Sequence, residues 1–379
     1  MTPLTQIPEE YRSWIKAMTF DLGIGPLPYT DNGPVLTIPL PGVYIPIETR
    51  TPSAGIKNPD PGHKPGENNS LSPPGQDFTG YPTMDIETLA ANQHCLMLCG
   101  EVGMGKTTLV KHLALTVIMG TCPPGLKGYL PFIVYLNALW PILLKAKSDI
   151  NGKSPGIIME HLVNRYLRET RCPLTIEILY DFLSRGKVLF LFDGLDEIPG
   201  HIRPGLIDIL AVFQMENSRN RFLFTGRPQG ITGGAMKWFG DYLQTIEYLD
   251  IPMIENFIFK WSDAVSHQSP IFKNISRQDL LSRIMKNVPA LVLTQVPSLL
   301  TAACILYRNV KCVSGQAPDI DDYIIEKLTG KGLLSHAESI KSNALFDYLL
   351  FIYAQTHNKN RETYANYSLH DVLQVFFFT

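Results

Sequence analysis

The sequence has no marked excess of either charge and no long hydrophobic run. Its 379 residues include 33 Lys and Arg against 35 Asp and Glu, which gives a formal net charge of −2. Such a balance offers no electrostatic footprint for nucleic acid or for an anionic membrane surface. No stretch approaches the ~18 apolar residues of a transmembrane helix, and the first ten residues lack the parts of a signal peptide. We therefore expect a cytoplasmic protein whose partners are small molecules or other proteins.

Cysteine is scarce, and its spacing is irregular. The six cysteines fall at positions 95, 99, 122, 172, 304 and 312. None of these spacings matches a zinc site or a disulfide framework, so we expect reduced thiols. Internal repeats are also absent from the sequence, and we expect no array of sensor repeats.

Proline and glycine mark one sharp change of composition. Seven prolines lie between residues 51 and 82, interleaved with Gly, Asn and Ser. Too few apolar groups remain there to form a packed structure, which predicts a flexible linker over 51–82. Residues 1–50 form an N-terminal lead-in segment, in which the pattern predicts a helix over 9–20 and a strand over 43–47.

Beyond the linker, short apolar segments alternate with helical stretches. This alternation is typical of a parallel sheet covered by helices on both faces. We expect strands at 95–99, 132–136, 188–192, 221–225 and 245–249, within a three-layer α/β domain over 83–250. Helices are expected at 254–265, 278–287, 297–308, 319–328 and 342–355. They would form a small all-helical domain over 251–330 and a partial winged-helix segment over 331–379.

A glycine-rich loop follows the first of these strands and opens a helix. This strand–loop–helix context is what a phosphate-binding loop requires, because its backbone N–H groups turn inward around the phosphates. Lys106 would contact the β- and γ-phosphates, and the Thr107 hydroxyl would ligate Mg²⁺. The predicted nucleotide-binding residues are Gly100, Glu101, Val102, Gly103, Met104, Gly105, Lys106, Thr107 and Thr108. The sequence thus predicts a P-loop NTPase that binds a nucleoside triphosphate.

A second group of polar residues ends the strand expected at 188–192. Asp193 follows this apolar run, and we expect it to hold Mg²⁺ through water together with Thr107. Asp196 and Glu197 lie just past the end of this strand, and either of them could orient or deprotonate an attacking water. A strand that is simply followed by an acidic turn is the alternative.

The next strand ends in Thr225-Gly-Arg227-Pro228. The carboxyl ends of parallel strands meet at one edge of a sheet. Arg227 would therefore reach the γ-phosphate and stabilise its charge, as an arginine finger in cis does. An ordinary surface arginine is the alternative.

Together these three motifs resemble the signatures of NACHT-type STAND NTPases, the switch ATPases of immunity and bacterial defence. Residues 10–47 resemble the lead-in segment of bacterial members, and residues 296–307 resemble the helix that they place over the base. The resemblance implies an ATP- and ADP-binding switch with Mg²⁺ and slow hydrolysis, a weak ATPase. It also implies that Pro297 contacts the adenine, although a proline also suits the first position of a helix.

The resemblance further implies a histidine that clamps the β-phosphate of ADP. His370, in the His-x-x-x-Gln-x-Phe pattern of residues 370–376, has the expected spacing, although it could equally be structural. Three consecutive phenylalanines at 376–378 suggest that the winged helix is truncated. Sensor or effector partners would then be separate chains or further copies of this one. A P-loop phosphotransferase and a nucleotide-binding interaction module without hydrolysis are the alternative functions.

Overall fold

The computed structural model describes most of the chain up to residue 314. The described residues are 6–22, 38–51, 83–146, 149, 151–231, 233–266, 277–286, 291 and 293–314. They divide into two compact units. The first holds the described parts of Met1–Ile15, Pro46–Gly100 and Leu113–Glu247, and the second those of Lys16–Ile45, Glu101–His112 and Tyr248–Thr379. The predicted domain boundaries at 50, 82, 250 and 330 remain predictions.

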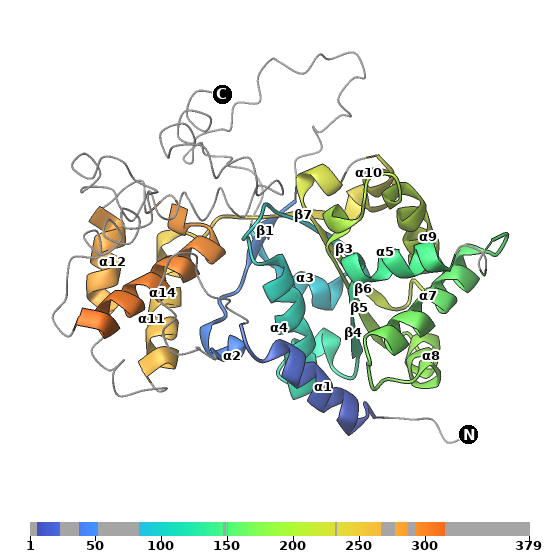
Figure 1. Cartoon of the computed structure of the whole chain (residues 1–379), viewed down its shortest axis with the longest axis horizontal. Helices are drawn as coiled ribbons and strands as arrows, with labels where there is room; N and C mark the ends of the chain where they lie inside the picture. The colour runs from blue at the N-terminus through green and yellow to red at the C-terminus, as the bar shows by residue number, and fades with distance from the viewer. Residues whose placement is uncertain are drawn as a thin grey trace, which may run out of the picture. The chain divides into compact units, whose positions relative to one another are not determined.

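The first unit contains a sheet of seven strands (Figure 1). The strands are β1 (Glu48–Arg50), β2 (Met84–Asp85), β3 (Cys95–Cys99), β4 (Leu130–Tyr135), β5 (Val188–Asp193), β6 (Arg221–Gly226) and β7 (Leu243–Ile246). Their order is β2-β1-β7-β3-β6-β5-β4. The strands from β7 to β4 are parallel, and β1 and β2 extend the sheet in antiparallel pairing. The predicted α/β fold with a mainly parallel sheet is confirmed.

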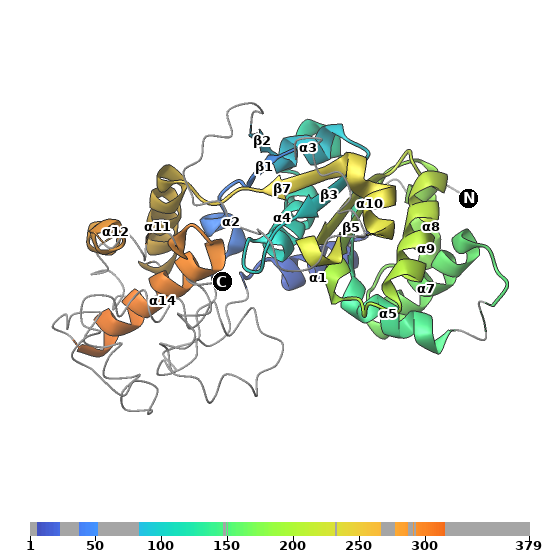
Figure 2. The same cartoon turned by 90° about the horizontal axis from the view of Figure 1, so that it is seen from above.

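Helices cover both faces of this sheet. The helices of the described residues are α1 (Glu9–Thr19), α2 (Leu40–Val43), α3 (Ile86–Asn92), α4 (Lys106–Met119), α5 (Leu136–Lys145), α7 (Pro155–Glu169), α8 (Ile176–Ser184), α9 (Arg203–Glu216), α10 (Gly234–Phe239), α11 (Ile251–Ser266), α12 (Arg277–Lys286) and α14 (Pro297–Ser314). Helices α7, α8 and α9 lie on one face, and α3 and the C-terminal half of α4 lie on the other (Figures 1 and 2). This division follows from right-handed crossovers, since the chain crosses the sheet in one direction through α4 and returns through α5 to α9.

Paired phenylalanines hold the centre of the sheet against its helices. On β5 and β6, Phe190 stacks on Phe222 at a ring distance of 5.0 Å, and Phe192 stacks on Phe224 at 5.1 Å. Side chains two residues apart on a strand share one face, so the four rings form a single layer. Phe213 of α9 meets Phe190 edge-on at 5.3 Å. Such pairs contribute about 0.5–1.5 kcal/mol each beyond the area they bury, and they fix the carboxyl ends of β5 and β6 side by side.

The N-terminal segment belongs to the folded structure. The predicted helix over 9–20 is confirmed as α1. Its Tyr11 is fully buried, and the phenol donates a hydrogen bond of 2.7 Å to the carbonyl of Pro131 in the edge strand β4. Burial raises the pKa of Tyr11 well above its ordinary value, so the phenol remains a neutral donor.

The predicted strand over 43–47 is wrong. Val43 ends the short helix α2, residues 44–47 are irregular, and the strand β1 begins only at Glu48. Pro46 explains the error, because it has no N–H to donate to a sheet. Val43, Tyr44, Ile45 and Ile47 are nevertheless buried. Their apolar character therefore reports burial and not strand geometry.

Some of the other predicted strands and helices lie within the described residues and some do not. The five strands expected after the linker are all present, although β7 begins two residues before and ends three residues before the predicted strand. The helices expected at 254–265, 278–287 and 297–308 are confirmed as α11, α12 and α14. Most of the linker, the helices expected at 319–328 and 342–355, and His370 lie outside the described residues. No helix in the described part of the chain is long and apolar enough to cross a membrane.

We expect Tyr11→Phe to lower the free energy of unfolding by about 1–3 kcal/mol, because it removes a buried hydrogen bond without changing the packed volume. Urea denaturation measures this change. Tyr242→Phe, at an exposed position, is the control and should change stability by less than about 0.5 kcal/mol. Equal effects of the two substitutions would show that α1 is not anchored through Tyr11.

Candidate functional site

The predicted phosphate-binding loop runs from Gly100 to Thr108, between the end of β3 and the first turn of α4. Gly103 and Gly105 have positive φ angles of 80° and 85°, a conformation that side chains other than glycine rarely adopt. The Nζ of Lys106 donates a hydrogen bond of 2.8 Å to the carbonyl of Glu101. The lysine side chain therefore folds back across the loop that its own helix begins from.

The start of the loop is fixed by the sheet. The N–H of Gly100 donates to the carbonyl of Gly226 at the end of β6, at 3.2 Å. A Cβ atom at Gly100 would lie 3.0 Å from the Cδ1 atom of Ile246 in β7. Gly100 therefore lies at the carboxyl edge of the sheet, between two neighbouring strand ends, where a larger residue would crowd the side chain of Ile246 in β7.

Helix α14 packs directly on the middle of the loop, within the second unit. The N–H of Ser298 donates to the carbonyl of Gly103 at 3.1 Å. A Cβ atom at Gly103 would lie 2.1 Å from the Oγ atom of Ser298 and 3.2 Å from a methyl group of Val296. Pro297 is the first residue of α14, as a proline at a helix start should be. Its contact with adenine remains a prediction.

The carboxyl end of β5 delivers Asp193 into a network with β6. Asp193 is only 8% exposed, and its Oδ1 accepts a hydrogen bond of 2.5 Å from the hydroxyl of Thr225. That hydroxyl in turn accepts from the N–H of Gly194 at 3.0 Å. Tyr135, the residue of β4 paired with Asp193, has its pKa raised to about 12 by burial and by the charge of Asp193.

Thr225 and Tyr135 were not identified from the sequence as site residues. The position of each at the carboxyl end of a strand that neighbours β5 was the available signal. Both keep a neutral hydroxyl near the carboxylate, and Thr225 donates to it. The carboxylate of Asp193 is thus oriented by β6.

Asp196 and Arg227 form a two-point contact between the loops that follow β5 and β6. The backbone N–H of Arg227 donates to Oδ1 of Asp196 at 3.1 Å, and its Nε lies 2.9 Å from Oδ2. Their side chains are 11% and 26% exposed. The terminal amino groups of Arg227 have no hydrogen-bond partner within the described part of the chain. Asp196 therefore holds Arg227 by its inner nitrogen and leaves the outer ones available.

Glu197 differs from Asp196 in its surroundings. It ends a short 3₁₀ helix, Leu195–Glu197, that follows Gly194, whose φ is 89°. The side chain of Glu197 is exposed, and it passes over Gly194, with its Cδ atom 3.1 Å from where a Cβ of that glycine would stand. The two acidic residues that the sequence left as alternatives therefore differ, since Asp196 is mostly buried against Arg227 and Glu197 is exposed.

The predicted site residues fall into two groups. Gly100, Asp193, Asp196, Glu197 and Arg227 belong to the first unit, and the loop from Glu101 onward belongs to the second together with Pro297. The sharing of one Mg²⁺ between Thr107 and Asp193 remains a prediction.

The two side chains predicted to hold Mg²⁺ carry the type of ligand atom that this ion prefers. Among the described residues, no group of three or more His, Cys, Asp or Glu could hold a metal ion. Mg²⁺ prefers oxygen ligands and commonly takes only one or two from protein, while phosphates and water complete its shell. The hydroxyl of Thr107 and the carboxylate of Asp193 are oxygen groups of this type, and their binding of Mg²⁺ remains a prediction.

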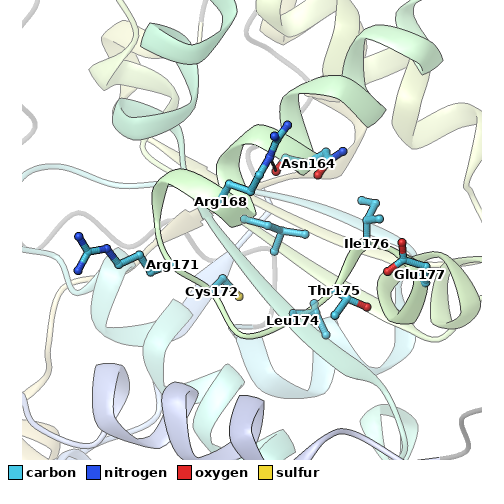
Figure 3. A pocket seen from close by; sticks show the side chains of 9 residues that line it. Asn164, Arg168, Arg171, Cys172, Leu174, Thr175, Ile176 and Glu177 are labelled. Carbon is cyan, nitrogen blue, oxygen red and sulfur yellow. Dashed lines mark hydrogen bonds between the residues drawn. The ribbon is translucent and has the colours of Figure 1, made fainter.

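A separate cavity of about 400 Å³ lies on the first unit, where α7 ends and α8 begins (Figure 3). Its lining includes Arg168, Arg171, Cys172 and Glu177. Burial raises the pKa of the Cys172 thiol to about 11, so this cysteine is not a reactive thiolate. None of the predicted site residues lines this cavity.

Comparison with known families identifies the part of the chain that carries the loop and the strand ends. Residues 94–231 match the NACHT domain family. The chain therefore contains a NACHT domain. This is a P-loop NTPase domain, a nucleotide-binding fold, and the matched range runs from β3 to just past Arg227 and Gly230. The resemblance stated from the three motifs is thus confirmed over this range.

Three solved structures that match this chain are distant from it in sequence. The Walker-type ATPase PABY2304 of Pyrococcus abyssi is 11% identical, with a TM-score of 0.38, and the match covers 76% of this chain and 85% of that one. PCH-2 of C. elegans is 12% identical, with a TM-score of 0.30 and coverage of 71% and 67%. A variant of RuvB from Thermotoga maritima is 12% identical, with a TM-score of 0.27 and coverage of 71% and 85%. A search of curated proteins gave no match.

We expect Gly103→Ala to weaken ATP binding by at least about tenfold and to lower the melting temperature. The substitution strains the backbone by about 1–2 kcal/mol, and it also forces the loop away from Ser298. Gly120→Ala is the matched control, because Gly120 has a similar φ of 74° and open space around it. Calorimetric titration and thermal unfolding would compare the two variants.

A substitution at Ser298 tests the contact between the loop and α14. Ser298→Gly removes the atom that a Cβ at Gly103 would strike, so it should restore part of the loss caused by Gly103→Ala. If the two glycine variants behave alike, backbone strain alone explains the requirement at Gly103 and the contact with α14 contributes nothing.

Proposed function

We propose that this NACHT protein is an ATP- and ADP-binding switch that hydrolyses ATP slowly with Mg²⁺ and acts in signalling or defence. The observation that carries the proposal is the contact between Asp196 and Arg227, which leaves the outer amino groups of Arg227 available at the carboxyl edge of the sheet. A cationic group so placed suits a γ-phosphate. A switch requires that the two nucleotide states differ in such a contact.

In this proposal, different residues bind the phosphates and the metal ion. The backbone of the loop and the ammonium of Lys106 would hold the phosphates, and Thr107 and Asp193 would hold Mg²⁺. The ion supplies charge stabilisation at the phosphate oxygens. Thr225 orients Asp193 by donating to its Oδ1, so that the second oxygen of the carboxylate keeps a fixed direction.

The geometry supports Glu197 over Asp196 as the residue that orients the attacking water. Asp196 already accepts a hydrogen bond from the backbone N–H of Arg227 and pairs with its guanidinium, so both of its oxygens are engaged with that residue. Glu197 is exposed and lies one residue further along the same turn. Asp196 would act instead by directing Arg227 toward the phosphate.

Two other functions compete with this proposal. A P-loop phosphotransferase needs a second substrate pocket with its own cationic and acidic groups. A nucleotide-binding interaction module would bind ATP without hydrolysis. Release of phosphate measured with and without small hydroxyl acceptors separates all three, since a switch releases phosphate to water at a low rate that acceptors do not change.

Nucleotide binding should depend on Lys106. Lys106→Ala removes the charge that lies across the loop, and charge-assisted contacts of this kind contribute about 1.5–3 kcal/mol. We expect ATP affinity to fall roughly 10- to 100-fold in calorimetric titration with Mg²⁺. Lys237→Ala, on helix α10 of the first unit, is the control. An unchanged ATP affinity of the Lys106→Ala variant would show that the nucleotide does not bind at this loop.

Hydrolysis should be separable from binding at Glu197. Glu197→Gln should slow phosphate release by roughly 10²- to 10⁴-fold, the range for loss of a positioned base, while ATP affinity stays within about threefold. Glu160→Gln on α7 changes an exposed glutamate elsewhere and should do neither. A turnover that Glu197→Gln leaves unchanged would favour the interaction module or transfer the role of base to another residue.

A further inference from the structure

Arg203, the first residue of α9, makes an unusual set of contacts. Its Nε and Nη2 donate to the carbonyl of Ile198 at 3.1 and 2.8 Å, and Nη2 also donates to the carbonyl of Asp196 at 3.1 Å. Its Nη1 donates to the carbonyl of Gln229 at 3.4 Å. All of its partners are backbone carbonyls, and no acidic side chain pairs with Arg203 in the described part of the chain.

Helix geometry does not explain this arginine. A cation in the first turn of a helix opposes the helix dipole and costs some stability, and α9 has no acidic residue in that turn to compensate. The carbonyls it binds come from two different loops. Asp196 and Ile198 follow β5, whereas Gln229 follows β6. The side chain therefore ties together the two loops that carry Glu197 and Arg227.

The same two loops meet at a second close contact. A Cβ atom at Gly230 would lie 2.7 Å from both the Cα and the Cβ of Asp196, so the backbones already touch. The two loops are therefore joined by three contacts: this one, the contact between Asp196 and Arg227, and the hydrogen bonds of Arg203. Only Arg203 among these binds backbone carbonyls of both loops with one side chain, because its planar guanidinium presents five donors in a fixed fork.

We propose that Arg203 is a positioning residue for the NTPase reaction. It holds the loop bearing Asp196 and Glu197 in register with the loop bearing Arg227, so that the water-orienting acid and the phosphate-binding cation keep a fixed separation. The proposal rests on the proposed function. A misplacement of about 1 Å at reacting groups can cost on the order of 10²-fold in rate, which is the scale of effect expected when the fork is lost.

A matched control is available at the opposite edge of the sheet. Arg219 also donates from its guanidinium to a backbone carbonyl, that of Ser184, at 2.9 Å. It precedes β6 instead of following it, so it lies at the amino ends of the strands. Removal of Arg219 takes away an arginine–carbonyl bond of the same kind without touching either loop.

The test compares Arg203→Met, Arg203→Lys and Arg219→Met in the full chain. We expect both Arg203 variants to lower kcat for ATP hydrolysis by about 10- to 100-fold and to keep ATP affinity within about threefold. Lysine should not rescue, because a single ammonium cannot span both loops. Arg219→Met should keep the parent kcat. A parent-like kcat in Arg203→Met, or recovery in Arg203→Lys, would overturn the proposal.

Hydrogen exchange gives a readout that does not depend on turnover. The N–H groups of Glu197 and Gly230 bond to the carbonyls of Gly194 and Arg227, at 3.0 and 2.8 Å, so both report on loop order. Arg203→Met should speed exchange at both amides, and Arg219→Met at neither. Unchanged protection in Arg203→Met would also overturn the proposal. A parent chain that releases no phosphate would instead refute the proposed function, and the exchange result would still decide whether Arg203 joins the loops.

Discussion

The hydrogen bonds that join the carboxyl ends of β3, β5 and β6 are the constraint on which the candidate site depends. Gly100 is tied to Gly226, and Asp193 to Thr225, so the three strand ends form one continuous edge. Parallel strands alone would bring these ends to the same side of the sheet. The cross-links convert that approximate alignment into defined positions for Asp193 and Gly100. The stacked phenylalanines of β5 and β6 resist any shift of one strand along the other.

Glycines in the site are favoured by close packing against neighbouring residues as well as by backbone torsion angles. Gly103 and Gly194 have positive φ angles, and sequence reasoning anticipates such residues in a tight loop. Gly230 shows no such angle, yet its missing side chain lets the loop after β6 press against Asp196. Gly103 meets both demands, since Ser298 occupies the space that a Cβ would need. A glycine required by packing against a distant segment cannot be recognised from its immediate sequence.

The sequence predicted what is encoded locally and missed what depends on distant pairing. The five strands after the linker, the helices α11, α12 and α14, and the placement of the three motifs at strand ends follow from apolar periodicity and from glycine and acidic residues at fixed spacing. The pairing of Asp196 with Arg227 joins residues 31 positions apart, and no pattern within either motif signals it. Arg203 was missed for the same reason, because its partners are backbone carbonyls that carry no side-chain signature. The false strand over 43–47 arose from the opposite error, in which an apolar run was interpreted without the effect of Pro46.

The strength of the contact between Asp196 and Arg227 determines how readily the guanidinium of Arg227 can change partners. With 11% and 26% of the two side chains exposed, the pair is neither fully buried nor fully exposed, so water still reaches it and screens part of its attraction. The backbone N–H of Arg227 adds a hydrogen bond that does not depend on the guanidinium. Asp196 can therefore remain bound to the backbone while the guanidinium is drawn toward a more highly charged anion. A stronger, fully buried pair would resist such a change, because separating it would leave an uncompensated charge. The partial exposure of this pair thus agrees with the role proposed for Arg227, in which the guanidinium would move between Asp196 and a phosphate.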